Sequence, residues 1–184
     1  LIDEMNDDKV KRPEIYNHKW LGEPSNLKGQ IYANFKKIAE IPKEAKYMGA
    51  GLDFGYTNDP TALIDVWKWN NAYILDEQLY SKGMRNSEIA NYIKSMKHYS
   101  GELVIADSAE PKSIDDIKDE GIVISGATKG KDSINNGIQL LQGLEIYYTE
   151  RSHNIEEEVL NYQWRVDKED KSLNIPIDAY NHAL

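Results

Sequence analysis

Residues 47–80 read YMGAGLDFGYTNDPTALIDVWKWNNAYILDEQLY, and this stretch decides the fold. A short apolar run over residues 47–54, closed by an aspartate and a glycine, is typical of a buried strand. Residues 61–69 and 72–80 are both rich in β-branched and aromatic side chains, which favour strands. Only Asn70-Asn71 separates these two runs, and asparagine tolerates the left-handed backbone of a two-residue hairpin turn. We therefore predict a three-stranded antiparallel meander.

Beyond residue 80 the hydrophobic pattern alternates between helical periods and short apolar runs. The periodic segments predict four helices, at residues 86–96, between Pro111 and Gly121, at 134–142, and after Ser152. The apolar runs predict strands at residues 103–106, 122–124 and 144–148, with a hairpin over 164–167 and 173–175. A meander followed by helix–strand alternation is the order of the ribonuclease-H-like fold. We therefore expect an α/β chain with a mixed sheet and helices on both faces, the first strand lying centrally beside the fourth.

Length and composition favour one folded domain with an appendage. The chain has 184 residues and no cysteine, so it contains no disulfide scaffold and no thiolate zinc site. Residues 1–45 show no clean hydrophobic stripe, in contrast to the rest of the chain. We expect them to be a linker or the trailing edge of another domain, with residues 46–184 forming the main domain. No apolar run is long enough to span a membrane, and no leader opens the chain, so we expect a soluble intracellular protein.

The charge balance argues at first sight against a nucleic-acid partner. The formal net charge is −9, whereas domains that bind nucleic acid usually carry a basic surplus. Residues 1–45 hold 8 basic and 8 acidic side chains, and residues 46–184 hold 14 basic and 23 acidic ones. The acidic surplus therefore lies entirely in the main domain, which either avoids polyanions or concentrates carboxylates for a chemical purpose.

Two aspartates occupy matching positions at the ends of predicted buried strands. Asp53 ends the first strand of the meander, and Asp107 ends the apolar run over residues 103–106. If these strands are parallel neighbours, both carboxylates emerge at one edge of the sheet, where a divalent cation relieves their repulsion. Either aspartate alone is more readily explained as a turn former or a helix cap, and Asp107, followed by Ser108, fits that explanation.

Five segments resemble, in chain order, sequences of the large terminase subunit of tailed bacteriophages. Two of them match the first and second nuclease motifs of that family, two match its later signatures, and one matches the tail of the preceding ATPase domain. They are LDFGYTNDPTA at residues 52–62, ADSAEPKSI at 106–114, KGKDSI at 129–134, NHAL at 181–184, and WLGE at 20–23.

This resemblance implies a metal-dependent endonuclease that cleaves concatemeric viral DNA by two-metal phosphodiester hydrolysis. Asp53 and Asp107 would be metal ligands for two Mg²⁺ or Mn²⁺ ions, and His182 would be a further ligand or proton shuttle. The third acidic ligand of the family would follow directly after Leu184. The implied partners are double-stranded viral DNA, an ATPase domain of the same polypeptide, the small terminase subunit and the portal, in the host cytoplasm.

Lys129 and Lys131 lie in a glycine-bearing loop before a predicted helix, where they would contact DNA phosphate or remain solvated. This loop lacks the spacing of an ATP-binding P-loop. Two other classes of function stay open from the residues. One is a non-catalytic module that docks on the packaging motor or on DNA, and the other is half of an actin- or hexokinase-like ATPase. His18, His98 and His153 are expected to be incidental.

Overall fold

The structure is a computed structural model, and it describes residues 2–11, 13, 16, 20, 29–128, 130, 133–166 and 172–176. The chain divides into two compact units. Among the described residues, one unit holds those up to residue 33 together with 156–176, and the other holds residues 34–155. No helix within these described ranges has the length and apolar character needed to cross a membrane.

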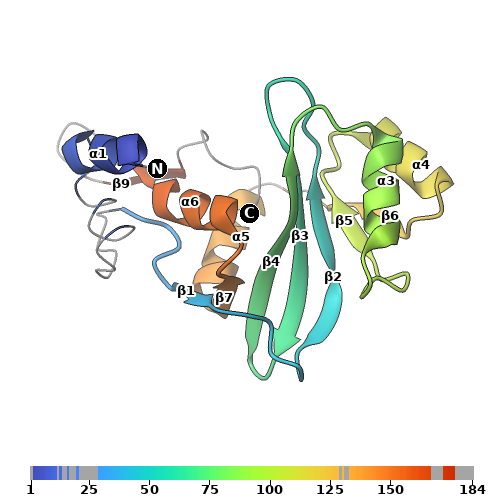
Figure 1. The fold of residues 1–184 in the computed structure, drawn as a ribbon, viewed down its shortest axis with the longest axis horizontal. Coiled ribbons are helices and arrows are strands. Elements are labelled where there is room, and N and C mark those ends of the chain that lie inside the picture. The colour runs from blue at the N-terminus through green and yellow to red at the C-terminus, as the bar shows by residue number, and fades with distance from the viewer. Residues whose placement is uncertain are drawn as a thin grey trace. The chain divides into compact units, whose positions relative to one another are not determined.

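The second unit contains a seven-stranded mixed sheet, in the order β1-β7-β4-β3-β2-β5-β6 (Figure 1). Its strands are β1 (Phe35–Ile38), β2 (Lys46–Asp53), β3 (Thr61–Trp69), β4 (Ala72–Ser81), β5 (Val104–Ala106), β6 (Ile124–Gly126) and β7 (Glu145–Thr149). The described residues contain the helices α1 (Ile2–Lys11), α3 (Asn86–Ser95), α4 (Pro111–Asp119), α5 (Ser133–Gln142) and α6 (His153–Asn161).

The antiparallel meander is confirmed over β2, β3 and β4. Trp69 pairs with Ala72 across the hairpin, and Asn70 has a φ of 53°, the left-handed conformation that a tight two-residue turn requires. β5 then pairs in parallel with β2, and β6 pairs in parallel with β5. The first strand of the meander therefore lies centrally beside the fourth strand, as the sequence predicts.

Helices α3 and α4 pack on one face of β2, β3, β5 and β6 (Figure 1). The apolar core between these layers is fully buried at Leu63, Ile93, Val104 and Ile117. α5 packs against β7 at the other end of the sheet. The predicted fold class, a ribonuclease-H-like α/β mixed sheet with flanking helices, is confirmed.

The first unit has a small core of its own, within residues 29–33 and 156–166. The Ile31 N–H donates to the Tyr162 carbonyl at 3.0 Å, and the rings of Tyr32 and Tyr162 stack with centroids 5.5 Å apart. The strands β8 (Trp164–Val166) and β9 (Ser172–Pro176) pair antiparallel, which confirms the predicted hairpin.

Three local features differ from the expectations. Residues 2–11 form a helix although their sequence shows no helical period. β1 lies within the predicted linker and joins the sheet through parallel pairing with β7. β6 begins two residues later than expected, since its pairing with β5 starts at Ile124, although Ile122 is buried before the strand. The division at residue 45 into a linker and a main domain stays a prediction.

Candidate active site

Asp53 and Asp107 lie at the same edge of the sheet on adjacent parallel strands. Gly51 pairs with Ile105 and Leu52 with Ala106, so the next step of the register sets the two aspartates side by side. The Asp107 N–H donates to the Leu52 carbonyl at 3.2 Å and extends the ladder to this position. Because neighbouring strands lie about 4.8 Å apart, the two half-buried carboxyl groups share one small region.

The loop that follows Asp53 is held in one closed conformation. Thr61, which is fully buried, donates from Oγ1 to the Gly55 carbonyl at 2.8 Å and accepts the Gly55 N–H at 3.3 Å. A Cβ on Gly55 would overlap the carbonyl oxygens of Asp59 and Pro60. Only glycine therefore permits the chain to fold back so tightly, and the closed loop fixes the end of β2 on which Asp53 stands.

Asp107 also shapes the turn into α4. Its Oδ1 accepts the Ala109 N–H at 2.8 Å, and its carbonyl accepts the Glu110 N–H at 3.4 Å. Pro111 then begins the helix, with Glu110 at the N-cap position but without a side-chain capping bond. One carboxylate oxygen of Asp107 therefore stabilises the turn, as the turn-forming interpretation predicts. It does not exclude a metal-binding role, because a carboxylate has further lone pairs.

Two half-buried carboxylates at a sheet edge offer oxygen ligands of the kind that a hard cation such as Mg²⁺ or Mn²⁺ prefers. Within the described part of the chain, no group of three His, Cys, Asp or Glu side chains is placed to hold a metal ion. The other predicted site residues, His182, Lys129 and Lys131, lie outside the described residues. The pair of aspartates is therefore the part of the predicted site that the structure brings together.

A cavity of about 870 Å³ opens beside this edge of the sheet. Its walls are the loop at residues 54–59, the start of α3, and one side of α4. Five of its lining residues are acidic, namely Asp59, Glu110, Asp116, Asp119 and Glu120. The expectations from the sequence do not include this cavity. The i, i+3, i+4 spacing of Asp116, Asp119 and Glu120 over the last turn and C-cap of α4 is the signal that could have indicated it.

Two further carboxylates are buried within the sheet, away from the candidate site. Asp65 is fully buried, and its Oδ2 lies 2.6 Å from His98 Nε2, while its Oδ1 accepts the Tyr47 hydroxyl at 3.1 Å. The pKa of Asp65 is raised to about 6, chiefly by burial and to a smaller extent by Asp76 on the neighbouring strand, while His98 and Tyr47 act in the opposite direction. Burial and Asp65 in turn raise the pKa of the Tyr47 phenol.

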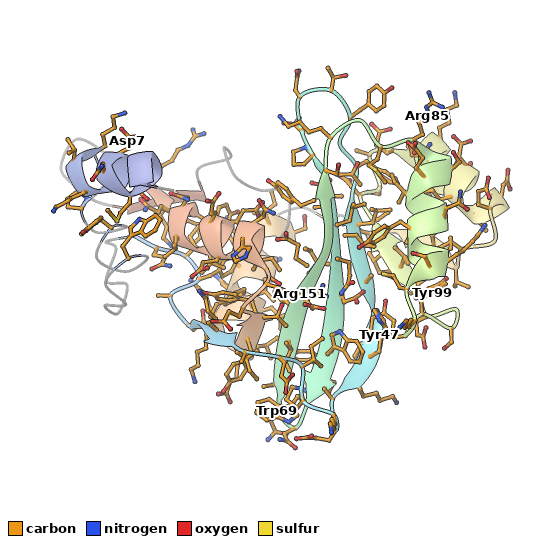
Figure 2. All side chains as sticks on the ribbon, in the orientation of Figure 1. Asp7, Tyr47, Trp69, Arg85, Tyr99 and Arg151 are labelled. Carbon is orange, nitrogen blue, oxygen red and sulfur yellow. The ribbon has the colours of Figure 1, made fainter. Side chains whose placement is uncertain are left out.

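Asp76 is held by a separate set of donors. It accepts from Thr149 Oγ1 at 2.6 Å and from Arg151 Nε at 2.8 Å, and Gln78 donates to its other oxygen. Figure 2 shows Tyr47 near one end of β2 and Arg85 near the opposite end of the sheet. His98 and Tyr47, both half-buried, form a structural cluster around the buried Asp65, towards the end of β2 opposite Asp53.

The strand order and the paired aspartates define a protein of the ribonuclease-H-like class. The family described as "Terminase RNAseH like domain" matches residues 53–184, and the chain belongs to this family. The chain is 31% identical over 197 residues to the large terminase subunit of Bacillus phage SPP1, covering all of this chain and 46% of that protein. It thus spans about half the length of this curated relative.

Solved structures show the same relationship. The g2p (large terminase) nuclease domain of bacteriophage SPP1, crystallised with bound Mn, matches with a TM-score of 0.69 and 27% identity, over 84% of this chain and 92% of that one. The large terminase of a thermophilic bacteriophage matches with a TM-score of 0.64 and 21% identity, over 97% of this chain and 48% of that one. At 21% identity, the match to the thermophilic phage terminase is evidence of the fold alone.

Proposed function

We propose that this chain is the metal-dependent endonuclease part of a phage large terminase subunit, cleaving double-stranded viral DNA during packaging. The observation that carries the proposal is the register that sets Asp53 beside Asp107 at one edge of the sheet. Family membership and the Mn bound in the SPP1 nuclease structure support the same assignment.

Asp53 and Asp107 would hold the metal, with His182 as a further ligand or proton shuttle. When bound, a pair of divalent cations supplies an activated water and stabilises the leaving oxygen of the phosphodiester. The contribution of this chain is to hold the two carboxylates in a fixed relative position. The β2–β5 ladder achieves this, together with the closed loop after Asp53 and the turn after Asp107. Lys129 and Lys131 would contact DNA phosphates.

The remainder of the subunit is proposed to supply an ATPase domain, of which residues 1–45 would be the trailing segment. In this account the full subunit acts in the host cytoplasm with the small terminase subunit and the portal. The acidic surplus of this chain is consistent with this arrangement, because DNA would then be bound mainly by other parts of the motor.

The test is nicking of supercoiled plasmid DNA by the full-length polypeptide in the presence of Mn²⁺ or Mg²⁺. We expect Asp53→Asn and Asp107→Asn each to abolish nicking while leaving the thermal unfolding transition cooperative. Asp115→Asn, which changes an exposed carboxylate on α4, is the matched control and should cut like the wild type. Undiminished cutting by both site variants would refute the proposal. A wild type that bound neither metal nor DNA would favour a docking module instead.

A further inference from the structure

Two loops at the candidate active-site edge are tied to each other. The first loop, residues 54–60, follows Asp53, and the second, residues 82–85, joins β4 to α3. The Gly83 N–H donates to the Tyr56 carbonyl at 2.8 Å and links the two loops. They emerge together at the end of the sheet at which β4 leads into α3 (Figure 1). The backbones of both loops are therefore held near the edge that carries Asp53.

Three side chains on the tied loops point to a ligand outside the described chain. Tyr56 is 61% exposed, so its ring is accessible to a ligand. Lys82 and Arg85 are also exposed, and neither side chain forms an ion pair within the described residues. Lysine and arginine side chains bind nucleic-acid phosphates, and exposed aromatic rings near them pack against nucleotides.

The backbone that carries these side chains is held by hydrogen bonds before any ligand binds. The first loop is closed by the Gly55–Thr61 hydrogen bonds, and Pro60 within it is buried. Arg85 precedes α3, where its backbone N–H donates to Glu88 Oε2 at 2.8 Å. Because little loop entropy remains to be lost, binding on this surface is preorganised.

The charge around these loops limits where a polyanion can lie. Arg85 is also a wall residue of the 870 Å³ cavity, whose other charged lining residues are all acidic. A phosphate chain would be repelled from the interior of that cavity and attracted to the two cations at its rim. The favourable path therefore runs over the loops and past the ends of β2 and β5.

We propose that Tyr56, Lys82 and Arg85 form a DNA-positioning rim, in which the two cations contact phosphates and the tyrosine ring packs against a deoxyribose next to the cleaved bond. This inference rests on the proposed nuclease function and adds to it the residues that hold the substrate strand.

The test measures binding of a short fluorescein-labelled DNA duplex to the full-length polypeptide by anisotropy, without divalent metal, across a series of salt concentrations. For Lys82→Ala/Arg85→Ala we expect the slope of log K against log salt to become shallower by about 2, because two phosphate contacts are lost. Tyr56→Ala should weaken binding by roughly tenfold, whereas Tyr56→Phe should retain it, since the ring and not the hydroxyl makes the contact.

Lys43→Ala/Lys46→Ala is the matched control. It removes the same two charges from exposed positions at the opposite end of β2, so it should leave the salt slope as in the wild type. The proposed DNA-positioning rim is overturned if the slope of log K against log salt is unchanged in the Lys82/Arg85 variant, or if it changes equally in the control. A wild type that binds the duplex but does not cut it with Mn²⁺ overturns the nuclease assignment alone. A wild type that binds no duplex overturns both.

Discussion

The four aspartates of the central strands differ in their surroundings more than in their sequence context. Asp53 and Asp107 stand half-buried at strand ends, whereas Asp65 and Asp76 are buried within β3 and β4 and paired with basic side chains. A buried carboxylate that already has a basic partner is a structural group. A pair of carboxylates set side by side at an open edge is where a cation is expected.

The first prediction at the residue scale concerns Gly55. Gly55→Ala should destabilise the chain by about 1–3 kcal/mol, because the new Cβ would overlap the Asp59 and Pro60 carbonyl oxygens. The same change should also reduce nicking, since the displaced loop carries the end of β2. Urea unfolding provides the measurement. Gly137→Ala on α5 is the control, because nothing lies within 4 Å of its Cβ position, and it should be neutral or stabilising. A Gly55→Ala variant as stable as the wild type would contradict the closed-loop account.

The second residue-scale prediction concerns the pH dependence of stability. The pKa of Asp65 is about 6 in the folded chain against 3.8 for an unperturbed aspartate, so the folded state holds its proton to higher pH. The stability linked to this proton is complete below pH 3.8 and is lost as the pH rises through 6. Relative to Asp65→Asn, the wild-type free energy of unfolding should fall by on the order of 2–3 kcal/mol across this window.

Urea unfolding at pH values from 4 to 7 measures this difference for the two proteins side by side. Parallel pH profiles would show that Asp65 ionises equally easily in the folded and unfolded chains, and would contradict the assignment of its burial as the dominant cause.

At the scale of elements, Glu77 on β4 caps the start of α6. Its Oε2 accepts the N–H groups of Asn154 and Ile155 at 3.1 and 3.2 Å, and its Oε1 accepts the Asn154 side-chain amide at 2.7 Å. Glu77→Ala leaves these donors without their acceptor and should cost about 1–2 kcal/mol of stability in urea unfolding. Glu150→Ala, at an exposed turn position, should change stability by less than about 0.5 kcal/mol. Equal effects of the two changes would refute the capping role.

The elements that the sequence predicts well are those whose signals are local. β3 has the predicted bounds because its β-branched and aromatic run is closed by an asparagine turn. β1 was missed because it has only four residues, two of them lysine, and is recognised as a strand only through its pairing with β7. A short edge strand of this kind depends on a partner far along the chain, which a local pattern does not reveal.

The same distinction applies to the candidate site. The side-by-side placement of Asp53 and Asp107 could be anticipated because each ends an apolar run, and parallel strands carry such ends to one edge. The Asp65–His98 contact could not be anticipated from the sequence, because it depends on where the segment after α3 returns to the sheet. Likewise, the Tyr56–Gly83 hydrogen bond joins two loops whose proximity follows only from the completed meander.

At the scale of the whole molecule, the net charge of −9 predicts that this chain alone binds DNA with low affinity. We expect its affinity for a duplex at moderate salt to be at least roughly tenfold below that of the full-length subunit, because a chain with few phosphate contacts loses most of its affinity as salt rises. Fluorescence anisotropy of both proteins with one labelled duplex makes the comparison. Equal affinities would place the main DNA contacts on this chain and contradict the proposed division of labour.

The central claim is that Asp53 and Asp107 share a divalent cation. The most direct measurement is a crystal structure of the polypeptide soaked in Mn²⁺, with anomalous diffraction recorded to locate the metal. We predict an anomalous peak within coordination distance of both carboxylates, lost in Asp53→Asn crystals soaked in the same way. A map with no manganese at this edge, in crystals of protein that still cuts DNA with Mn²⁺, would contradict the account.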